Sequence, residues 1–389
     1  MALAALAQAV AGLGPVMLER LEGLVAIESG SHHGPGIDAA GDRLEALWRG
    51  LGFIAARKNI GAAADLRCFN RSAGAPGRLL ILGHLDTVWP AGTTADWPFA
   101  TAGNTATGPG IGDMKAGLIM AHAAIEALLA VRGRMPGEIR MLLVPDEELG
   151  SPRSRPHIEA AAEWADWVLV MEPARPDGAV IAARGAVGAL IATAEGTSAH
   201  VLNRATGASA VSHLADKIAA LEALTDPALG TSVSVGIIRG GDARQVIPRQ
   251  CELHIDLRAP TAVAAEALLA QVNHILAAPG IQGVTVTCAG GITRPAFPTS
   301  ASAGIFPRAA RIAAELAIPY GATTTQGGSD GSFAAALGRP TLDGLGPICL
   351  DTCSRRERIL LPSLHDRTVL LAALIADLSA NPESPPAWH

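Results

Sequence analysis

Acidic side chains and one histidine stand where short apolar segments end, a placement in which they could share a metal ion. His84 and Asp86 follow the apolar run 79–82 and a glycine. Because side chains at positions i and i+2 of an extended chain point to the same side, the imidazole and the carboxylate can face one point. Asp113 follows a Gly- and Pro-rich loop and comes just before the apolar segment 114–130, which predicts a helix.

Two later apolar runs also end in acid. Residues 139–145 run into the three acids 146–148, and residues 167–171 are followed by Glu172. Strand and helix ends are where α/β folds place their sites. Carboxylates that converge there repel one another unless a cation compensates them. Histidine and carboxylate together are ligands for a divalent ion, so the pattern predicts a metal centre.

Four motifs in chain order carry a resemblance to a known family. They are GHLDTV (83–88), GPGIGDMKAG (108–117), PDEELGS (145–151) and MEP (171–173). In this order they resemble the two-metal aminoacylase and carboxypeptidase family, which includes glutamate carboxypeptidase, acetylornithine deacetylase and succinyl-diaminopimelate desuccinylase. The resemblance covers nearly the whole chain and is closest to the glutamate carboxypeptidase branch. It implies a metal-dependent hydrolase that cleaves the carbon–nitrogen bond of a small carboxylate-bearing substrate, such as an N-acyl amino acid or a dipeptide.

The resemblance also implies a ligand set. Asp113 would bridge two metal ions through its two oxygens, and His84, Glu148 and Glu172 would each hold one ion. Taken alone, His84 would be a buried structural histidine, and the surrounding pattern is what favours a ligand. The expected cofactor is one or two Zn²⁺ ions per subunit, with Co²⁺ or Mn²⁺ as alternatives.

Two acids are expected to act beside the metals. Asp86 should bond the far ring nitrogen of His84 and fix its tautomer. Adjacent glutamates of an extended chain point to opposite sides, so Glu148 can bind metal while Glu147 faces the water. A metal lowers the pKa of that water, and Glu147 as general base would pass its proton to the leaving nitrogen.

Four residues of the segment 182–290 and its border are candidates for contact with the substrate. His200, in GTSAHVLNRATGASA, matches the family's histidine that reaches the partner subunit's active site and stabilises an oxyanion. Arg258 in DLRAP and Arg294 in TRPAF match positions expected to hold a substrate carboxylate. Gln245 in RQVIP stands where the family usually has Asn. The alternative for both arginines is an ordinary surface position.

The last metal ligand departs from the family pattern. Cys353 in DTCSRRER stands where the family has a histidine. A thiolate is a competent zinc ligand, so Cys353 either holds the second metal or leaves that site weak, altered or empty. His365 is twelve residues further on and is expected at the surface, and His32 and His33 are expected in a solvated loop.

These departures leave two further functions open. The changes at Cys353 and Gln245 would suit hydrolysis of an unusual amine or amide. A non-catalytic relative that kept the fold and lost one metal is an alternative of another class. The presence of Glu147 argues against it, because a binding-only descendant has no need of a general base.

Composition excludes several kinds of partner. The formal net charge of the 389 residues is −6 with no basic stripe, so nucleic acid is not an expected partner. No apolar stretch is expected to span a bilayer. The N-terminal segment has its first positive charge at Arg20, which predicts an amphipathic helix and not an export signal. Five scattered cysteines do not form a disulfide framework. We therefore expect a cytoplasmic protein without a membrane partner.

The fold class predicted from these patterns is α/β, with a mostly parallel sheet flanked by helices and an inserted ferredoxin-like α+β domain. The catalytic metal-binding domain would comprise 1–181 and 291–389. The insert, 182–290, would carry the contact of a homodimer or higher homo-oligomer and close over the active site, as the resemblance implies. Outside the insert, we expect two helices within 1–57, helices at 300–317, 331–336 and 364–378, a strand at 340–345, and a tail at 380–389.

Overall fold

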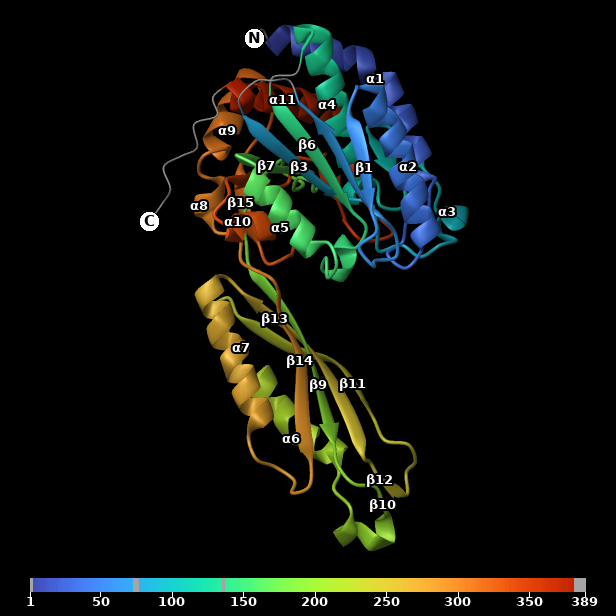
Figure 1. Ribbon diagram of the computed structural model, residues 1–389, viewed down its shortest axis with the longest axis vertical. Coiled ribbons are helices and arrows are strands. Elements are labelled where there is room, and N and C mark those ends of the chain that lie inside the picture. Colours follow the sequence, from blue (N-terminus) through green and yellow to red (C-terminus); the bar gives the residue numbers. More distant parts are fainter. Residues whose placement is uncertain (1–2, 73–76, 135–136, 381–389) are drawn as a thin grey trace. The chain divides into compact units, whose positions relative to one another are not determined.

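The computed structural model describes residues 3–72, 77–134 and 137–380. The chain divides into two compact units (Figure 1). Unit 1 consists of Met1–Ala183, Pro298–Thr324 and Ser329–His389, and unit 2 of Arg184–Phe297 and Thr325–Gly328. The expected tail lies almost wholly outside the described residues.

A six-stranded sheet forms the centre of unit 1. Its strand order is β1-β2-β6-β3-β7-β16. Strand β3 pairs in parallel with β6 and β7, and β16 pairs in parallel with β7, whereas β2 runs antiparallel to both of its neighbours. The expected α/β class is confirmed, with a sheet that is mixed at one edge. The strands are β1 (Ile54–Lys58), β2 (Leu66–Arg71), β3 (Arg78–His84), β6 (Glu138–Val144), β7 (Trp167–Val170) and β16 (Thr341–Leu342).

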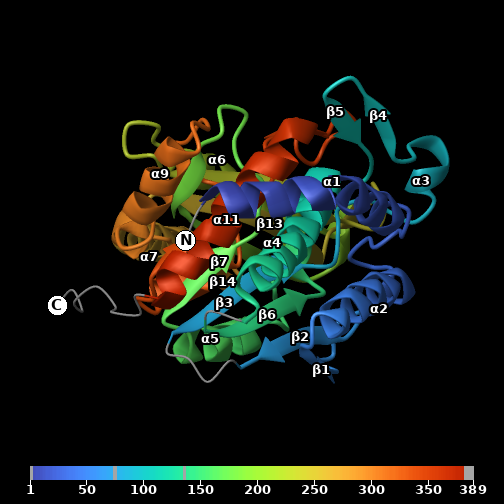
Figure 2. The ribbon, with the colours of Figure 1, turned by 90° about the horizontal axis from the view of Figure 1, so that it is seen from above.

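Helices cover both faces of this sheet (Figure 2). Alternate residues of β3 point to opposite faces, so Leu79 and Ile81 belong to one core and Leu80 and Leu82 to the other. The first core includes α1 (Leu3–Val25), α2 (Gly34–Gly50), α4 (Ala116–Arg132), α9 (Phe306–Glu315) and α11 (Leu361–Ala380). The second includes α5 (Arg155–Trp164) and α10 (Gly331–Ala336).

Helix α4 is the most apolar helix of unit 1. The span Ile111–Arg132 has 22 residues and a mean hydropathy of 1.6, which is long and apolar enough for a bilayer. The expectation that no stretch reaches this length was therefore wrong. However, 78% of its most apolar window is buried, and α4 packs against α1 and α11. Its apolar surface is accounted for by the core of unit 1.

The expected helix at 300–317 is two helices, α8 (Thr299–Ser302) and α9. Gly304 lies in the break and Pro307 occupies the first turn of α9, where a proline's missing N–H costs nothing. The expected strand at 340–345 shortens to β16. Unit 1 also contains α3 (Thr93–Asp96) and the small sheet β17-β18-β5-β4, made of Cys349–Leu350, Arg358–Leu360, Thr105–Thr107 and Ala100–Ala102. A further pair joins β8 (Val180–Arg184) to β15 (Ala322–Thr325).

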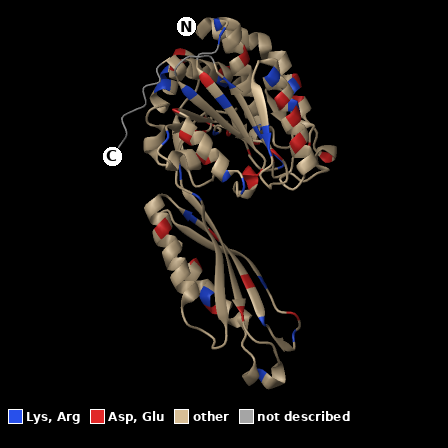
Figure 3. Cartoon of the chain, viewed as in Figure 1, with Lys and Arg blue, Asp and Glu red and all other residues tan. Residues whose placement is uncertain are grey.

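Residues of both charges lie along α2 (Figure 3). Arg49 pairs with Glu45 one turn away at 2.9 Å, and Arg57 reaches the same carboxylate at 2.8 Å. The surface of this helix therefore has no single sign of charge.

Unit 2 is built on an antiparallel sheet of order β11-β13-β9-β14. Burial alternates along β9 and β13, and the buried residues pack against α6 and α7. Helix α6 begins at Ala210, where the side chain of Ser209 caps it by accepting the Ser212 N–H. The elements are β9 (Ala186–Glu195), α6 (Ala210–Glu222), β11 (Ser232–Gly240), β13 (Gln250–Ala259), α7 (Ala262–Ala277) and β14 (Thr285–Arg294), with the small pair β10 (Ala199–His200) and β12 (Val246–Ile247).

Candidate metal centre

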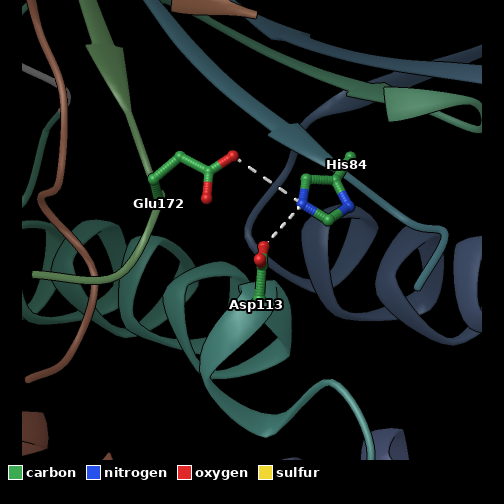
Figure 4. A group of neighbouring side chains, drawn as sticks. All are labelled: His84, Asp113 and Glu172. Carbon is green, nitrogen blue, oxygen red and sulfur yellow. Dashed lines mark hydrogen bonds and ion pairs between the residues drawn. The ribbon is translucent and has the colours of Figure 1, made fainter. Parts of the chain in front are cut away.

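Three predicted ligands meet at the carboxyl ends of β3 and β7 (Figure 4). His84 is the last residue of β3, Glu172 follows β7, and Asp113 lies in the segment Ile111–Lys115 just before α4. The Nε2 atom of His84 is 3.0 Å from Oδ1 of Asp113 and 3.8 Å from Oε1 of Glu172. One donor atom from each residue lies within 4.8 Å of the others, a spacing that a single cation can bridge.

A second group of donors shares Asp113 with the first. Asp113, Glu148 and Cys353 each offer a donor atom within 4.8 Å of the others. The thiol of Cys353 donates to Oδ2 of Asp113 at 3.4 Å, while Oδ1 faces His84. The two oxygens of Asp113 thus face two adjacent groups of donor atoms.

The buried carboxylates are electrostatically unfavourable without a cation. Burial and the neighbouring charge of Asp113 raise the pKa of Glu148 to about 9, and the same two causes raise the pKa of Glu172 well above its usual value. Burial opposes a charge on His84, yet its bonds to Asp113 and Asp86 outweigh burial and raise its pKa. Oε1 of Glu148 is buried and has no hydrogen-bond partner among the described residues. A divalent cation would satisfy that oxygen and stabilise the ionised carboxylates, so this donor set fits a metal.

Asp86 contacts His84 differently from the prediction. Nδ1 of His84 lies 2.9 Å from the backbone oxygen of Asp86, and its distance to the carboxylate is 3.6 Å. The backbone carbonyl is therefore the nearer acceptor for the Nδ1 proton, which leaves Nε2 facing the ligand group. The carboxylate of Asp86 instead accepts the backbone N–H groups of Glu147 and Glu148 at 3.0 and 3.1 Å, and the hydroxyl of Ser31 at 2.8 Å.

The extended geometry assumed for the two glutamates was wrong. Residues Glu147–Leu149 form a turn of 3₁₀ helix that follows β6. Glu147 is buried, and its charge contributes to raising the pKa of His84 and of Glu172. It belongs to neither ligand group found among the described residues. The turn, held by Asp86, thus places Glu148 in the second donor group and leaves Glu147 outside both groups.

Glu357 is a residue of the centre that the sequence did not single out. It is fully buried, and its carboxylate accepts the backbone N–H of Gly112 at 2.8 Å, of Asp113 at 3.4 Å and of Cys353 at 3.0 Å. Burial raises its pKa to about 7. One side chain therefore ties together the two loops that carry Asp113 and Cys353. The one feature of the sequence that could have pointed to Glu357 is its position, an acid four residues after Cys353.

The remaining candidates lie in unit 2. The structure brings His200 and Gln245 together, since His200 pairs with Val246 and the Val201 N–H donates to the Gln245 carbonyl at 3.0 Å. Both side chains are exposed.

The two predicted carboxylate-binding arginines differ from each other. Arg258 forms a two-bond pair with Asp256 at 2.8 and 2.9 Å and also donates to the carbonyl of Gln326. Arg294 is 5% exposed and packs against Gly328. A substrate carboxylate at Arg258 would have to share the guanidinium with Asp256.

The other histidines of the prediction lie outside both ligand groups of the described chain. His365 is partly exposed in α11, with its ring nitrogens 2.9 Å from Asp366 and 3.2 Å from the carbonyl of Ala7. His32 is exposed and His33 half-buried in the loop before α2.

The α/β fold thus carries two adjacent donor groups that could hold metal ions. The model of Peptidase family M20/M25/M40 matches residues 80–377, and the chain belongs to this family. It is an enzyme that acts on carbon–nitrogen bonds of small molecules.

Similar proteins include both curated sequences and solved structures. Carboxypeptidase G2 of Pseudomonas sp. (strain RS-16) is 28% identical over 380 residues, which cover 96% of this chain and 92% of that protein. A succinyl-diaminopimelate desuccinylase of Rhodopseudomonas palustris is 32% identical over 61% of this chain and 67% of that one. The M20 family metallo-carboxypeptidase Sso-CP2 of Sulfolobus solfataricus has a TM-score of 0.75 at 16% identity, with 92% and 98% of the two chains covered.

Proposed function

We propose that this protein hydrolyses the amide bond of an N-acyl amino acid or a dipeptide at a two-metal centre. The observation that carries the proposal is the position of Asp113, whose two oxygens serve two groups of donor atoms. His84 and Glu172 would complete one group, and Glu148 and Cys353 the other. The names of the relatives, a carboxypeptidase and desuccinylases, support an amide substrate with a carboxylate.

Zinc is the metal we propose, with cobalt or manganese as alternatives. When bound, it would act as a Lewis acid and lower the pKa of the attacking water. Its donor set of imidazole, carboxylates and one thiol suits zinc. The carbonyl of Asp86 holds Nδ1 of His84 and so presents Nε2 to the ion.

Glu147 would serve as the general base. The backbone N–H groups of Glu147 and Glu148 both donate to Asp86, which fixes the turn that carries the two glutamates. With Glu148 holding metal, Glu147 would take a proton from the attacking water and deliver it to the leaving nitrogen. Asp86 in this scheme is a positioning residue and does not take the proton.

Cys353 sets the character of the second metal position. Burial and the charge of Asp113 raise the pKa of its thiol, so the free thiol is protonated. A zinc ion would displace that proton, because a coordinating thiol is deprotonated. The other possibility is a weaker or altered second position, which would suit an unusual amine or amide substrate.

Unit 2, which corresponds to the insert predicted at 182–290, would be a ferredoxin-like domain that carries a homodimer contact and acts as a lid. Support comes from its strand-helix-strand-strand-helix-strand order of long elements. His200, beside Gln245, would stabilise the oxyanion in the partner's site. Arg258 and Arg294 would hold the substrate carboxylate. We place the dimer in the cytoplasm.

The test is metal analysis of the purified protein followed by assays on a panel of N-acyl amino acids and dipeptides. We expect one or two zinc ions per subunit and hydrolysis of part of the panel. A protein that holds no metal and shows no turnover with zinc, cobalt or manganese would contradict the proposal and favour a non-catalytic relative.

A further inference from the structure

An open pocket of about 450 Å³ lies in unit 1 against one carboxylate of the metal centre. Its walls are the backbone segments 30–33 and 87–91, together with Glu148 and Leu149. Glu148 is both a proposed metal ligand and part of the wall. A substrate group on the Glu148 side of the centre would therefore extend directly into this pocket.

The lining of the pocket is largely apolar and has no fixed positive charge. Val88, Trp89, Pro90 and Leu149 supply the apolar surface, and Val88 and Leu149 are 45% and 47% exposed. No lysine or arginine is among the lining residues of this described part of the chain, and its only basic side chains are those of His32 and His33. An anionic group would lose its hydration against the apolar side chains and find no lysine or arginine there to pair with. An uncharged apolar group would instead cover surface that is now in water.

Hydrogen bonds hold the two backbone walls together. The Ser31 N–H donates to the carbonyl of Thr87 at 3.1 Å, and the Thr87 N–H donates to the carbonyl of Ser29 at 2.9 Å. A preformed wall lowers the cost of ordering on binding.

The aromatic wall is braced from outside the pocket. Trp89 stacks edge-on against Trp97 with ring centroids 4.9 Å apart, and the guanidinium of Arg355 lies 5.5 Å from the centroid of Trp89. The apolar surface is thus held in place before a ligand arrives.

We infer that this pocket takes an uncharged, apolar acyl group, the size of a six-carbon chain or a phenyl ring, and rejects acyl groups that end in a carboxylate. The amino-acid part of the substrate carries a carboxylate and is unsuited to an apolar pocket that offers no lysine or arginine, which leaves the acyl part. The inference rests on the proposed amide hydrolysis. It specifies that the acyl group of the substrate is apolar, and it distinguishes this enzyme from hydrolases of succinyl amides.

The experiment compares N-hexanoyl, N-acetyl and N-succinyl derivatives of one accepted amino acid on the zinc-loaded enzyme. We expect kcat/KM for the hexanoyl compound to exceed that for the succinyl compound at least about tenfold. Val88→Lys adds a positive charge to the wall and should reduce this ratio about tenfold. Ile54→Lys changes a residue that is 75% exposed on β1 and is not part of the lining, so the ratio should stay at the wild-type value.

The outcomes separate the pocket from the reaction. Equal kcat/KM for hexanoyl and succinyl amides, or an unchanged ratio in Val88→Lys, would overturn the inference and leave amide hydrolysis intact. If no amide is hydrolysed, the proposed function fails, and calorimetry of hexanamide and succinamate with the zinc-loaded protein tests the pocket by itself. Tighter binding of hexanamide, weakened in Val88→Lys, would support the pocket; equal binding of both would overturn it.

Discussion

The thiol of Cys353 donates a hydrogen bond to Oδ2 of Asp113 across 3.4 Å. The two residues are 240 positions apart in the chain. Cys353 comes from the loop between β17 and β18, where its φ of 58° is in the left-handed region. The family resemblance places a histidine at this position, and the structure brings the cysteine to the same carboxylate that faces His84. The substitution therefore lies within the second group of donors.

Replacing Cys353 by Ser should lower zinc occupancy. A hydroxyl is not among the usual zinc ligands, whereas a thiolate is. We expect metal analysis to show the loss of about one ion per subunit. Cys288→Ser, at an exposed cysteine of unit 2, is the matched control and should keep full occupancy. Unchanged metal content and rate in Cys353→Ser would show that the thiol is not a ligand.

Replacing Glu147 by Ala should abolish turnover and leave metal content near wild type. Loss of a general base lowers kcat by about 10²- to 10⁴-fold. Glu148→Ala is the companion variant, and it should lose metal because Glu148 supplies a donor atom. Both properties are measured by a steady-state assay and elemental analysis of the same preparation. Metal loss in Glu147→Ala with retention in Glu148→Ala would mean that the two roles are exchanged.

Replacing Glu357 by Gln should weaken metal binding without removing a ligand. The carboxylate accepts backbone N–H groups from both loops, and the amide nitrogen of Gln cannot accept. Loss of a residue that orients ligands typically costs about 10- to 100-fold in metal affinity. Competition with a chelator measures this affinity. Glu163→Gln, at an exposed glutamate of α5, should behave as wild type. Wild-type affinity in Glu357→Gln would show that the two loops are held by other contacts.

Acid should destabilise unit 1 through His122. Burial is the main cause that lowers the pKa of this histidine, and the charge of Arg20 lowers it further. The hydrogen bond to the Leu47 carbonyl and the negative charge of Glu126 oppose the shift without cancelling it. Its folded-state pKa lies below the unfolded value of about 6.5, so the unfolded chain takes up the proton first as the pH falls. The contribution of neutral His122 to the free energy of unfolding is therefore fully present above about pH 6.5, and it is lost as the pH falls through the folded-state pKa.

The measurement for His122 is the drop in melting temperature between pH 7.5 and pH 5.5. Gln at this position cannot take up the proton, so His122→Gln should show a smaller drop than wild type. His274→Gln, at an exposed histidine of α7, should show the wild-type drop. An equal drop in wild type and His122→Gln would exclude a contribution from His122.

Much of the centre could be predicted because its ligands follow buried strands. His84 and Glu172 each follow an apolar run, and β3 and β7 are parallel neighbours, so their ends meet. Asp113 was predicted at a helix start and is found there. These positions follow from local patterns and from the rule that parallel strands end at one edge.

The contacts of the second group could not be predicted in this way. Glu357 meets Gly112 across 245 positions through a side chain and a backbone N–H, a contact with no local signature. Residues 147–149 form a turn where an extended chain was expected, because the carboxylate of Asp86 accepts two of the turn's backbone N–H groups. By contrast, the break between α8 and α9 could have been predicted from Gly304 and Pro307, since glycine and proline mark helix boundaries.

The central claim is that Asp113 lies between two metal ions. A crystal structure of the zinc-loaded protein with anomalous scattering at the zinc edge tests it most directly. We predict two peaks per subunit, one contacting His84, Asp113 and Glu172, the other contacting Asp113 and Glu148 with the Cys353 sulfur at about 2.3 Å. Zinc peaks that do not contact Asp113, or no peak at all, would contradict it.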